Sequence, residues 1–245
     1  MIVQIYEIQT PEEAIALLHM GVQHIGSVAL PTLTKRDPIL YQTIQLVHNY
    51  GAKSSLIPLF SEPDRIFQLM EDYSPDIIHF CENILTLDKL DPIVRFQKKV
   101  KQNFPKIQIQ RAIPIPVSGK GKIEKVLKIA KELEDVSDYF LTDTVLEPNE
   151  SSGLMDTQSV SGFVGITGQV CDWEIARSLV QQSKIPVIIA GGLSPQNVKD
   201  AIEKIKPAGV DSCSATNQLD DHGKPIRFKK DMNKVGEFIK NAKSD

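Results

Sequence analysis

Residues 186–198 read PVIIAGGLSPQNV, in which a short apolar run passes through two glycines into a helix-forming segment. The β-branched residues of 186–190 predict a buried strand. The two glycines predict a tight turn, and the Ser-Pro pair that follows predicts the start of a helix over 194–205. A strand followed at once by a helix is the repeating unit of parallel α/β folds.

The same unit recurs along the chain, where eight β-rich runs alternate with eight segments of helical period. Strands are predicted at 2–8, 22–30, 52–60, 75–81, 106–115, 137–142, 186–190 and 208–215. Helices are predicted at 11–20, 37–50, 62–72, 88–104, 120–135, 172–183, 194–205 and 231–243. Eight repeats in 245 residues favour closure into a (β/α)8 TIM barrel. An open doubly wound sheet would carry a Gly-rich turn after its first strand, whereas residues 7–11 read EIQTP. We expect one domain over residues 1–245.

Composition limits the partners that the chain is expected to have. With 28 Lys+Arg against 31 Asp+Glu, the net charge of -3 gives no reason to expect nucleic acid or an anionic membrane. There is no apolar run of about 20 residues that would cross a bilayer, and the N-terminus has no signal-peptide pattern. Cys81, Cys171 and Cys213 are widely spaced, so neither a disulfide framework nor a metal site is expected. Free thiols are typical of the cytoplasm, where we expect the protein to act as a monomer or homodimer.

Three turns in the last third of the chain predict a phosphate site. GITGQVCDWEIA (165–176), the GG turn after 186–190 and AGVDSCSATN (208–217) follow neighbouring strands. Glycines let the backbone approach an anion, and helix N-termini offer free N–H groups. A lone GG is more simply a turn, but three converging turns favour a pocket for a phosphorylated small molecule. The residues predicted to bind the phosphate are Gly168, Gly191, Gly192, Ser214 and Ala215.

These motifs resemble those of the phosphoribosylanthranilate isomerase family of tryptophan biosynthesis. SDYFLTDT (137–144), GITGQVCDW (165–173), PVIIAGGLSPQNV (186–198) and GVDSCSATN (209–217) carry the resemblance, with VQIYEIQTPEEA (3–14) at the N-terminal end. It implies a TIM barrel that performs an Amadori rearrangement, the aldose–ketose isomerisation of N-(5-phosphoribosyl)anthranilate. That reaction needs a general acid and a general base but no metal or cofactor.

The resemblance implies roles for single residues. Asp143 falls at the position of the general acid, although an Asp after a strand is also a common turn residue. Arg36 falls at the position of a substrate-binding arginine. Arg111 takes the place of a basic residue at the end of strand 5. His79 is a substrate-binding candidate whose alternative is a satisfied polar core residue.

The general base is the point of departure from the family, because Tyr6 stands where the family has a cysteine. A tyrosine, with a reference pKa of about 10, is a poor base near neutral pH. Glu7, which replaces the adjacent glycine, would serve only as a base borne on a loop. Cys81 would serve if its pKa is lowered, although a free cysteine is more commonly a small buried apolar residue.

Two functions therefore remain open. The chain either catalyses this isomerisation or one on a related phosphorylated sugar, or it is a diverged barrel that binds or converts another phosphorylated ligand. The long connection 143–171, which is rich in Ser and Gly, is expected on the active-site face.

Overall fold

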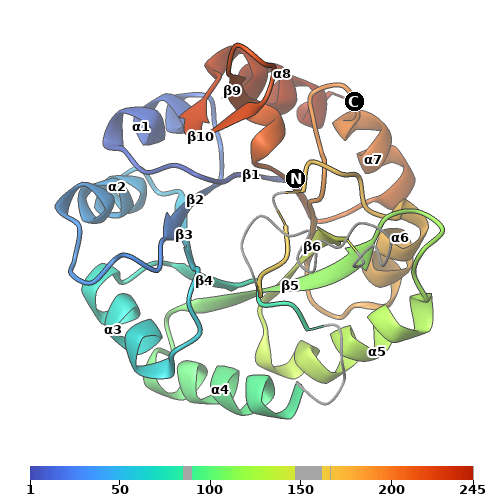
Figure 1. Cartoon of the computed structure of the whole chain (residues 1–245), viewed down its shortest axis with the longest axis horizontal. Helices are drawn as coiled ribbons and strands as arrows, with labels where there is room; N and C mark the ends of the chain where they lie inside the picture. The colour runs from blue at the N-terminus through green and yellow to red at the C-terminus, as the bar shows by residue number, and fades with distance from the viewer. Residues whose placement is uncertain (85–89, 147–161, 166, 245) are drawn as a thin grey trace.

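The computed structural model describes residues 1–84, 90–146, 162–165 and 167–244, whose arrangement is shown in Figure 1. Eight parallel strands close into a barrel in sequence order, with β8 hydrogen-bonded back to β1. The strands are β1 (Ile2–Ile5), β2 (His24–Ala29), β3 (Lys53–Pro58), β4 (Ile77–Phe80), β5 (Gln108–Pro116), β6 (Tyr139–Val145), β7 (Val187–Ile189) and β8 (Gly209–Ser212). The predicted (β/α)8 barrel is confirmed.

Helices surround the barrel and cover the outer face of the strands (Figure 1). They are α1 (Pro11–His19), α2 (Pro38–Asn49), α3 (Pro63–Tyr73), α4 (Leu90–Asn103), α5 (Ile123–Leu133), α6 (Trp173–Gln182), α7 (Val198–Ile205) and α8 (Met232–Lys243). Their starts follow the sequence signals. The Thr10 hydroxyl accepts from the backbone N–H of Glu13 at 3.3 Å, and the Asp172 carboxylate caps α6 in the same way.

The start of α7 differs from the prediction, because the helix begins at Val198 rather than at residue 194. The Asn197 side chain accepts a hydrogen bond from the backbone N–H of Ser194 at 2.8 Å, so the predicted first turn is a separate turn. The Ser-Pro signal placed the helix start one turn too early, because the Asn197 side chain bonds back to Ser194 and makes no cap hydrogen bond to α7.

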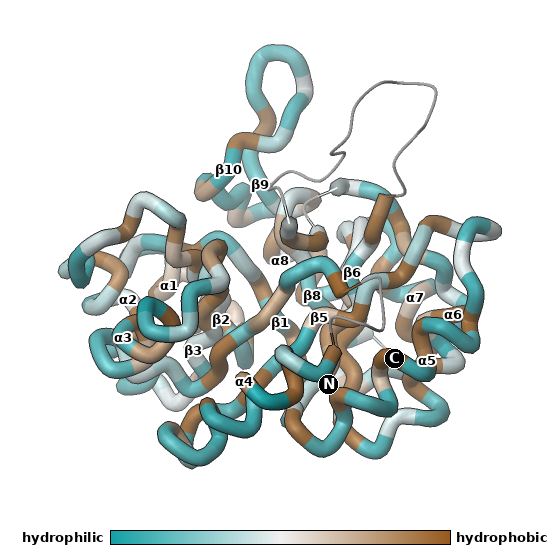
Figure 2. Tube along the Cα trace, turned by 60° about the horizontal axis from the view of Figure 1, so that its bottom comes forward, coloured by the Kyte–Doolittle hydropathy of each residue, from teal (hydrophilic) through white to brown (hydrophobic). Residues whose placement is uncertain are grey.

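A second difference lies after β8, where the sequence predicted no regular structure before the last helix. The short 3-10 helix η3 (Ser214–Thr216) is followed by an antiparallel hairpin of β9 (Asn217–Leu219) and β10 (Pro225–Lys230). The Asp220 carboxylate accepts from the backbone N–H groups of His222 and Lys224 and shapes the turn. Figure 2 shows this hairpin standing out from the barrel.

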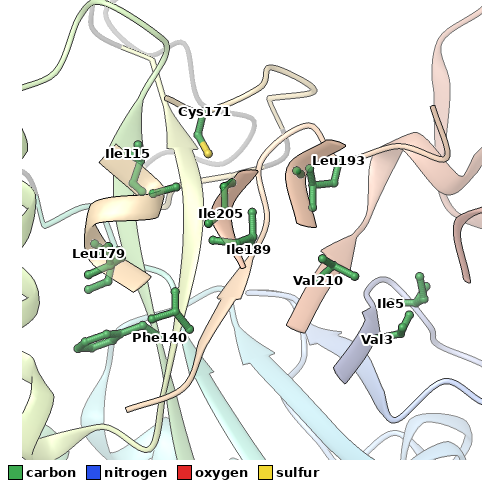
Figure 3. Close-up of a cluster of buried hydrophobic side chains, with 14 of the residues drawn as sticks. Val3, Ile5, Ile115, Phe140, Cys171, Leu179, Ile189, Leu193, Ile205 and Val210 are labelled. Atoms are coloured by element: carbon green, nitrogen blue, oxygen red, sulfur yellow. The ribbon is translucent and has the colours of Figure 1, made fainter. Parts of the chain in front are cut away.

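The hydrophobic core lies between the strands and the surrounding helices. Figure 3 shows side chains of this cluster, in which Phe140, Ile189 and Val210 of the strands are buried together with Leu179 and Ile205 of the helices. Truncating a fully buried side chain such as Phe140 to alanine would cost about 3–5 kcal/mol. This packing fixes the positions of the strand ends that carry the site.

The amino-terminal end of the barrel interior is filled by polar side chains. The Lys53 ammonium donates to Gln108 Oε1 at 2.6 Å and to the Tyr139 hydroxyl at 3.0 Å, across the starts of β3, β5 and β6. The opposite, carboxyl-terminal end carries the connecting loops where TIM barrels build their sites. Within the described residues, no helix is long and apolar enough to span a bilayer.

Candidate active site

A pocket opens at the carboxyl ends of the strands and collects most of the residues predicted from sequence. Ten of the twelve predicted site residues line it: Tyr6, Glu7, His79, Cys81, Asp143, Gly168, Gly191, Gly192, Ser214 and Ala215. Asp211 and Arg227, which the sequence analysis did not single out, line it as well. The strand ends therefore bring together residues that are up to 220 positions apart.

Asp143 lies in β6 with its carboxyl group buried in the pocket. Burial raises its pKa to about 7, against the lowering effect of the backbone N–H of Thr144, which donates to Oδ1 at 2.9 Å. Gly165 packs against the other oxygen, because a Cβ at that position would overlap Oδ2. A carboxyl group with this pKa holds a proton in a large share of molecules at neutral pH, as a general acid requires.

Asp211 lies in β8 and is a second buried carboxyl group of the same pocket. Burial is the main cause that raises its pKa to about 7, and the negative charge of Asp143 adds to the effect. Gln4 donates from Nε2 to Asp211 Oδ1 at 3.1 Å, which fixes the side chain. The sequence signal that would have found it is a carboxylate inside an apolar strand, in GVDS.

The strand register explains why the two carboxyl groups meet. Leu141 of β6 pairs with Ile188, and Ile188 pairs with Gly209 of β8. Asp143 lies two residues after Leu141 in β6, and Asp211 lies two residues after Gly209 in β8. They therefore occupy corresponding register positions on β6 and β8, and both side chains line the same pocket.

Tyr6 points into the barrel below the pocket, and its hydroxyl group is fully engaged. It lies 2.5 Å from the Ser55 hydroxyl and 2.8 Å from Nδ1 of His79, and it accepts from Gln110 at 3.4 Å. Burial raises the pKa of Tyr6 well above 10. The ring lies against Gly26, where a Cβ would overlap the ring carbon Cδ1 of Tyr6. The phenol is thus held neutral as part of the pocket floor.

Glu7 follows the end of β1 with a left-handed backbone, at φ 66°. Its carboxylate accepts from Arg227 Nε at 2.6 Å and from Asn217 Nδ2 at 3.0 Å. Burial works to raise its pKa, but these two partners outweigh burial and lower it below the ordinary value. Glu7 therefore stays ionised and joins β1 to the hairpin.

Cys81 and His79 both face the pocket from the end of β4, as their shared strand parity predicts. Burial raises the pKa of the Cys81 thiol well above its ordinary value, and the nearby Glu82 charge adds to this. Burial also lowers the pKa of His79 to about 3, so the imidazole is neutral. Neither group carries a charge at neutral pH.

The predicted phosphate-binding turns meet on one side of the pocket. Gly192 has a φ of 67°, and a Cβ there would lie 2.6–2.7 Å from the backbone of Gln169 and Val170. Gly191 packs in the same way against Thr144, whose hydroxyl donates to the Gln169 carbonyl at 2.7 Å. The turn after β7 is thereby pressed onto the loop that contains Gly168. The rest of the connection 143–171 falls largely on 147–161 and 166, outside the described residues.

Two predicted substrate-binding arginines lie outside the pocket lining. Arg36 is exposed on the β2–α2 connection, with its guanidinium 3.9 Å from the Tyr41 ring centroid. Arg111 is buried behind β5, where Nε donates to Gln97 at 2.8 Å and Nη1 to Glu82 at 2.7 Å. In this structure both side chains are engaged by other residues of the chain.

A closed barrel with a pocket at the carboxyl ends of its strands is the architecture of a TIM-barrel enzyme. Residues 89–241 match the family model of N-(5'phosphoribosyl)anthranilate (PRA) isomerase. A curated N-(5'-phosphoribosyl)anthranilate isomerase from Aquifex aeolicus is 33% identical over 158 residues, 63% of this chain and 69% of that protein. One from Methanocella arvoryzae is 29% identical over 96% of this chain and 94% of its own length.

Solved structures agree at the level of the fold. The N-(5'-phosphoribosyl)anthranilate isomerase from Pyrococcus furiosus superposes with a TM-score of 0.67 at 22% identity, covering 99% of this chain and 98% of that one. A phosphoribosyl anthranilate isomerase in complex with reduced 1-(o-carboxyphenylamino)-1-deoxyribulose 5-phosphate gives 0.63 at 19% identity, with 99% of both chains covered. The chain belongs to the PRA isomerase family, a family of isomerases in tryptophan biosynthesis.

Proposed function

We propose that this chain catalyses the isomerisation of N-(5'-phosphoribosyl)anthranilate to its aminoketose, with Asp143 as general acid and Asp211 as general base. The observation that carries the proposal is the pair of buried carboxyl groups that line one pocket, each with its pKa raised to about 7. Near neutral pH, such a pair holds one proton and one negative charge in a large share of molecules. An isomerisation that donates one proton and removes another needs this combination.

The phosphate group is proposed to bind at the cup formed by Gly168, Gly191, Gly192, Ser214 and Ala215. The absence of side chains at the glycines leaves backbone N–H groups accessible to a dianion. Binding there would place the ribose between β6 and β8. This positioning supplies much of the rate enhancement, since both reacting groups are then held beside the sugar.

The proposed reaction has two proton transfers. Asp143 donates its proton to the ribose ring oxygen as the C1′–O bond breaks, and the anthranilate nitrogen becomes a protonated Schiff base. Asp211 then removes the proton at C2′, and the electron pair of that C–H bond forms the C1′–C2′ double bond of an enolamine. Tautomerisation of the enol gives the ketone, and proton exchange with water restores both carboxyl groups.

Asp211 is preferred as the base over the three candidates from the sequence. The hydroxyl of Tyr6 is already hydrogen-bonded and its pKa is raised, and the pKa of Cys81 is raised too. The carboxylate of Glu7 is ion-paired with Arg227. Asp211 combines a place on the pocket wall with a pKa near the working range of a general base.

A second candidate function is a diverged barrel that binds or converts another phosphorylated ligand. It is favoured by the large tyrosine at position 6, where the family resemblance places a cysteine. We also propose that the protein acts in the cytoplasm without a nucleic-acid partner, as monomer or homodimer, since its net charge is -3 and Cys81 and Cys171 are buried free thiols.

The test is an assay of the purified chain with N-(5'-phosphoribosyl)anthranilate, which follows the loss of substrate fluorescence. We expect turnover, and we expect Asp143→Asn and Asp211→Asn each to lower kcat by at least about 100-fold. Asp220→Asn, on the hairpin turn, is the matched control and should retain turnover. No turnover by the wild type, with no rescue of a tryptophan-requiring strain, would reject the activity in favour of the diverged barrel.

A further inference from the structure

Asp211 belongs to a row of polar side chains that crosses four neighbouring strands. In the register of the barrel, Asp211 of β8 pairs with Gln4 of β1, Gln4 pairs with His24 of β2, and His24 pairs with Lys53 of β3. We call these four residues the polar row. Asp211, Gln4 and His24 are at most 5% exposed. The polar row therefore connects the pocket with the buried polar side chains around Lys53.

Two hydrogen bonds give the Gln4 amide a single orientation. Nε2 of Gln4 donates to Asp211 Oδ1 at 3.1 Å, and Oε1 of Gln4 lies 3.2 Å from Nδ1 of His24. Because an ionised carboxylate can only accept hydrogen bonds, the amide N–H2 group faces Asp211 and the amide oxygen faces the imidazole. The imidazole must then donate from Nδ1, which sets its tautomer.

The surroundings of His24 keep its ring neutral. Burial lowers the pKa of His24 to about 4, and the positive charge of Lys53 adds to this, whereas the negative charge of Asp76 works against it. A neutral imidazole carries one N–H group. With that group at Nδ1, rotation of the Gln4 amide by 180° would bring two donors together on one side and two acceptors together on the other.

The two oxygens of the Asp211 carboxyl group have different surroundings. Oδ1 is held by Gln4, whereas Oδ2 accepts no hydrogen bond from the residues that the structure describes. Since Asp211 lines the pocket, Oδ2 is the oxygen that remains for a ligand. The hydrogen bond from Gln4 stabilises the ionised form of the group without adding a positive charge beside it.

Other ionisable groups also act on Asp211. The negative charge of Asp143 on β6 raises its pKa, as burial does, and the positive charge of Lys230 on β10 lowers it. Tyr6 and Cys213 lie close enough to interact with its charge, but burial raises the pKa of both, so they are neutral at neutral pH. The Gln4 amide is the neutral donor among these groups.

We propose that Gln4, oriented by His24, is the positioning residue of Asp211: it holds Oδ1 in the ionised state and so makes Oδ2 the oxygen that removes the C2′ proton. This inference rests on the proposed function and deepens it. A neutral donor favours the carboxylate, yet it leaves a stronger base than a cation at the same place would. His24 acts one residue further away by preventing rotation of the amide.

The first measurement does not depend on turnover, because it follows the titration of the Asp211 carboxyl carbon by 13C NMR without substrate. The proteins are wild type, Gln4→Met, Gln4→Lys and His24→Phe. Gln110→Met is the matched control, since Gln110 is an equally buried glutamine whose amide bonds to Tyr6 instead. Asp211→Asn identifies the resonance, and thermal melting checks folding. The second measurement is kcat and KM from pH 5 to pH 9.

Gln4→Met removes the donor and should raise the pKa of Asp211 by about one to two pH units. It should lower kcat at pH 7 by about 10- to 100-fold, with KM within about twofold, and move the maximum of kcat/KM to higher pH. Gln4→Lys supplies a cation and should move both the pKa and the maximum to lower pH. His24→Phe keeps the ring contact with Tyr139 and should act like Gln4→Met, but less strongly.

An unchanged Asp211 pKa in Gln4→Met, or the same shift in Gln110→Met, would overturn the inference and leave the proposed function intact. A shifted pKa without loss of kcat would overturn it too, because Gln4 would then not act on the reaction. If Gln4→Met does not fold, His24→Phe decides by the same measurements. If the wild type shows no turnover while the pKa shifts appear, the proposed function fails and the coupling of Gln4 to Asp211 stands.

Discussion

Nδ1 of His79 lies 2.8 Å from the phenol oxygen of Tyr6, so that β4 and β1 are joined by a hydrogen bond across the inside of the barrel. Ser55 of β3 reaches the same oxygen at 2.5 Å. Tyr6 is therefore the centre of a buried polar network at the floor of the pocket.

Tyr6→Phe tests whether that network is structural. The change leaves the Ser55 hydroxyl and His79 without their partner, and it should lower the free energy of unfolding by about 1–3 kcal/mol. Since the phenol is held neutral, turnover should stay within about threefold of the wild-type rate. Urea unfolding and the fluorescence assay measure the two effects. If a folded variant instead turns over slower by about 100-fold or more, the phenol has a catalytic role.

The pH dependence of kcat/KM reports on the two carboxyl groups. The pKa of Asp143 and of Asp211 is raised to about 7, mainly by burial. If the reaction requires one proton on the pair, the plot of kcat/KM against pH should be bell-shaped with its maximum near pH 7. The two apparent pKa values of this profile belong to the pair rather than to either residue. A profile that is flat from pH 6 to pH 9 would contradict this assignment.

The same pKa shifts make stability fall as pH rises. Each carboxyl group has a pKa of about 7 in the folded state against an ordinary value of 3.8, so the folded state binds these protons more tightly than the unfolded state does. The resulting contribution to the free energy of unfolding is fully present below about pH 4. This stability is lost as pH rises through 7. Asp143→Asn, which cannot ionise, should therefore gain stability relative to wild type between pH 5 and pH 8, by at most about 3 kcal/mol. Urea unfolding at pH 5 and at pH 8 measures this gain in the free energy of unfolding. If the variant shows no gain, burial is not the cause of the raised pKa of Asp143.

Glu7→Gln should have the opposite pH dependence. The pKa of Glu7 is lowered by Asn217 and Arg227, so its contribution is present above its ordinary pKa of 4.5 and is lost as pH falls through the lower folded value. At pH 7 the variant should be less stable by about 1–3 kcal/mol, and the deficit should vanish in acid. Glu62→Gln, which breaks the exposed pair with Arg65, is the control and should show no measurable change. A deficit that persists below pH 4 would show that shape rather than charge matters at Glu7.

Two glycines of the predicted cup give a matched pair for substitution. At Gly192 an added Cβ would collide with the backbone of Gln169 and Val170, whereas at Gly168 there is open space. Both have a positive φ, so an L-residue in that region costs about 1–2 kcal/mol at either position. Gly192→Ala should in addition weaken the binding of inorganic phosphate by tenfold or more. Gly51→Ala is the control, because Gly51 also has a positive φ and open space but lies outside the cup, and equal phosphate affinity in Gly51→Ala and Gly192→Ala would count against the cup.

The fold could be predicted from sequence because alternation of strand and helix is a local pattern. The caps at Thr10 and Asp172 act over three residues, and closure of the barrel follows from the number of repeats. The hairpin could not be predicted because its strands are short and mostly polar, so they show no buried face. The predicted start of α7 is wrong by one turn because the hydrogen bond from the Ser194 backbone to the Asn197 side chain forms a turn that the Ser-Pro signal does not reveal.

Residues of the site could be predicted where a sequence motif contains them. They could not be predicted where contacts between distant parts of the chain bring a residue to the pocket. Asp143, near the carboxyl end of β6, and the glycines fall in recognisable stretches and do line the pocket. Asp211 is hidden inside a strand, and the place of Arg227 depends on an ion pair with a residue 220 positions away. The roles of all of these residues stay predictions until the variants are measured.

The contact between the Tyr6 ring and Gly26 makes position 6 hard to change on its own. A cysteine there would leave an empty space over Gly26. It would also leave the Ser55 hydroxyl and the His79 imidazole without the hydrogen-bond partner that the phenol now provides. The effect of introducing a thiol thus depends on the background in which it is made. Laboratory evolution toward a thiol-based catalyst would have to randomise positions 6, 26, 55 and 79 together, because single steps pass through poorly packed intermediates.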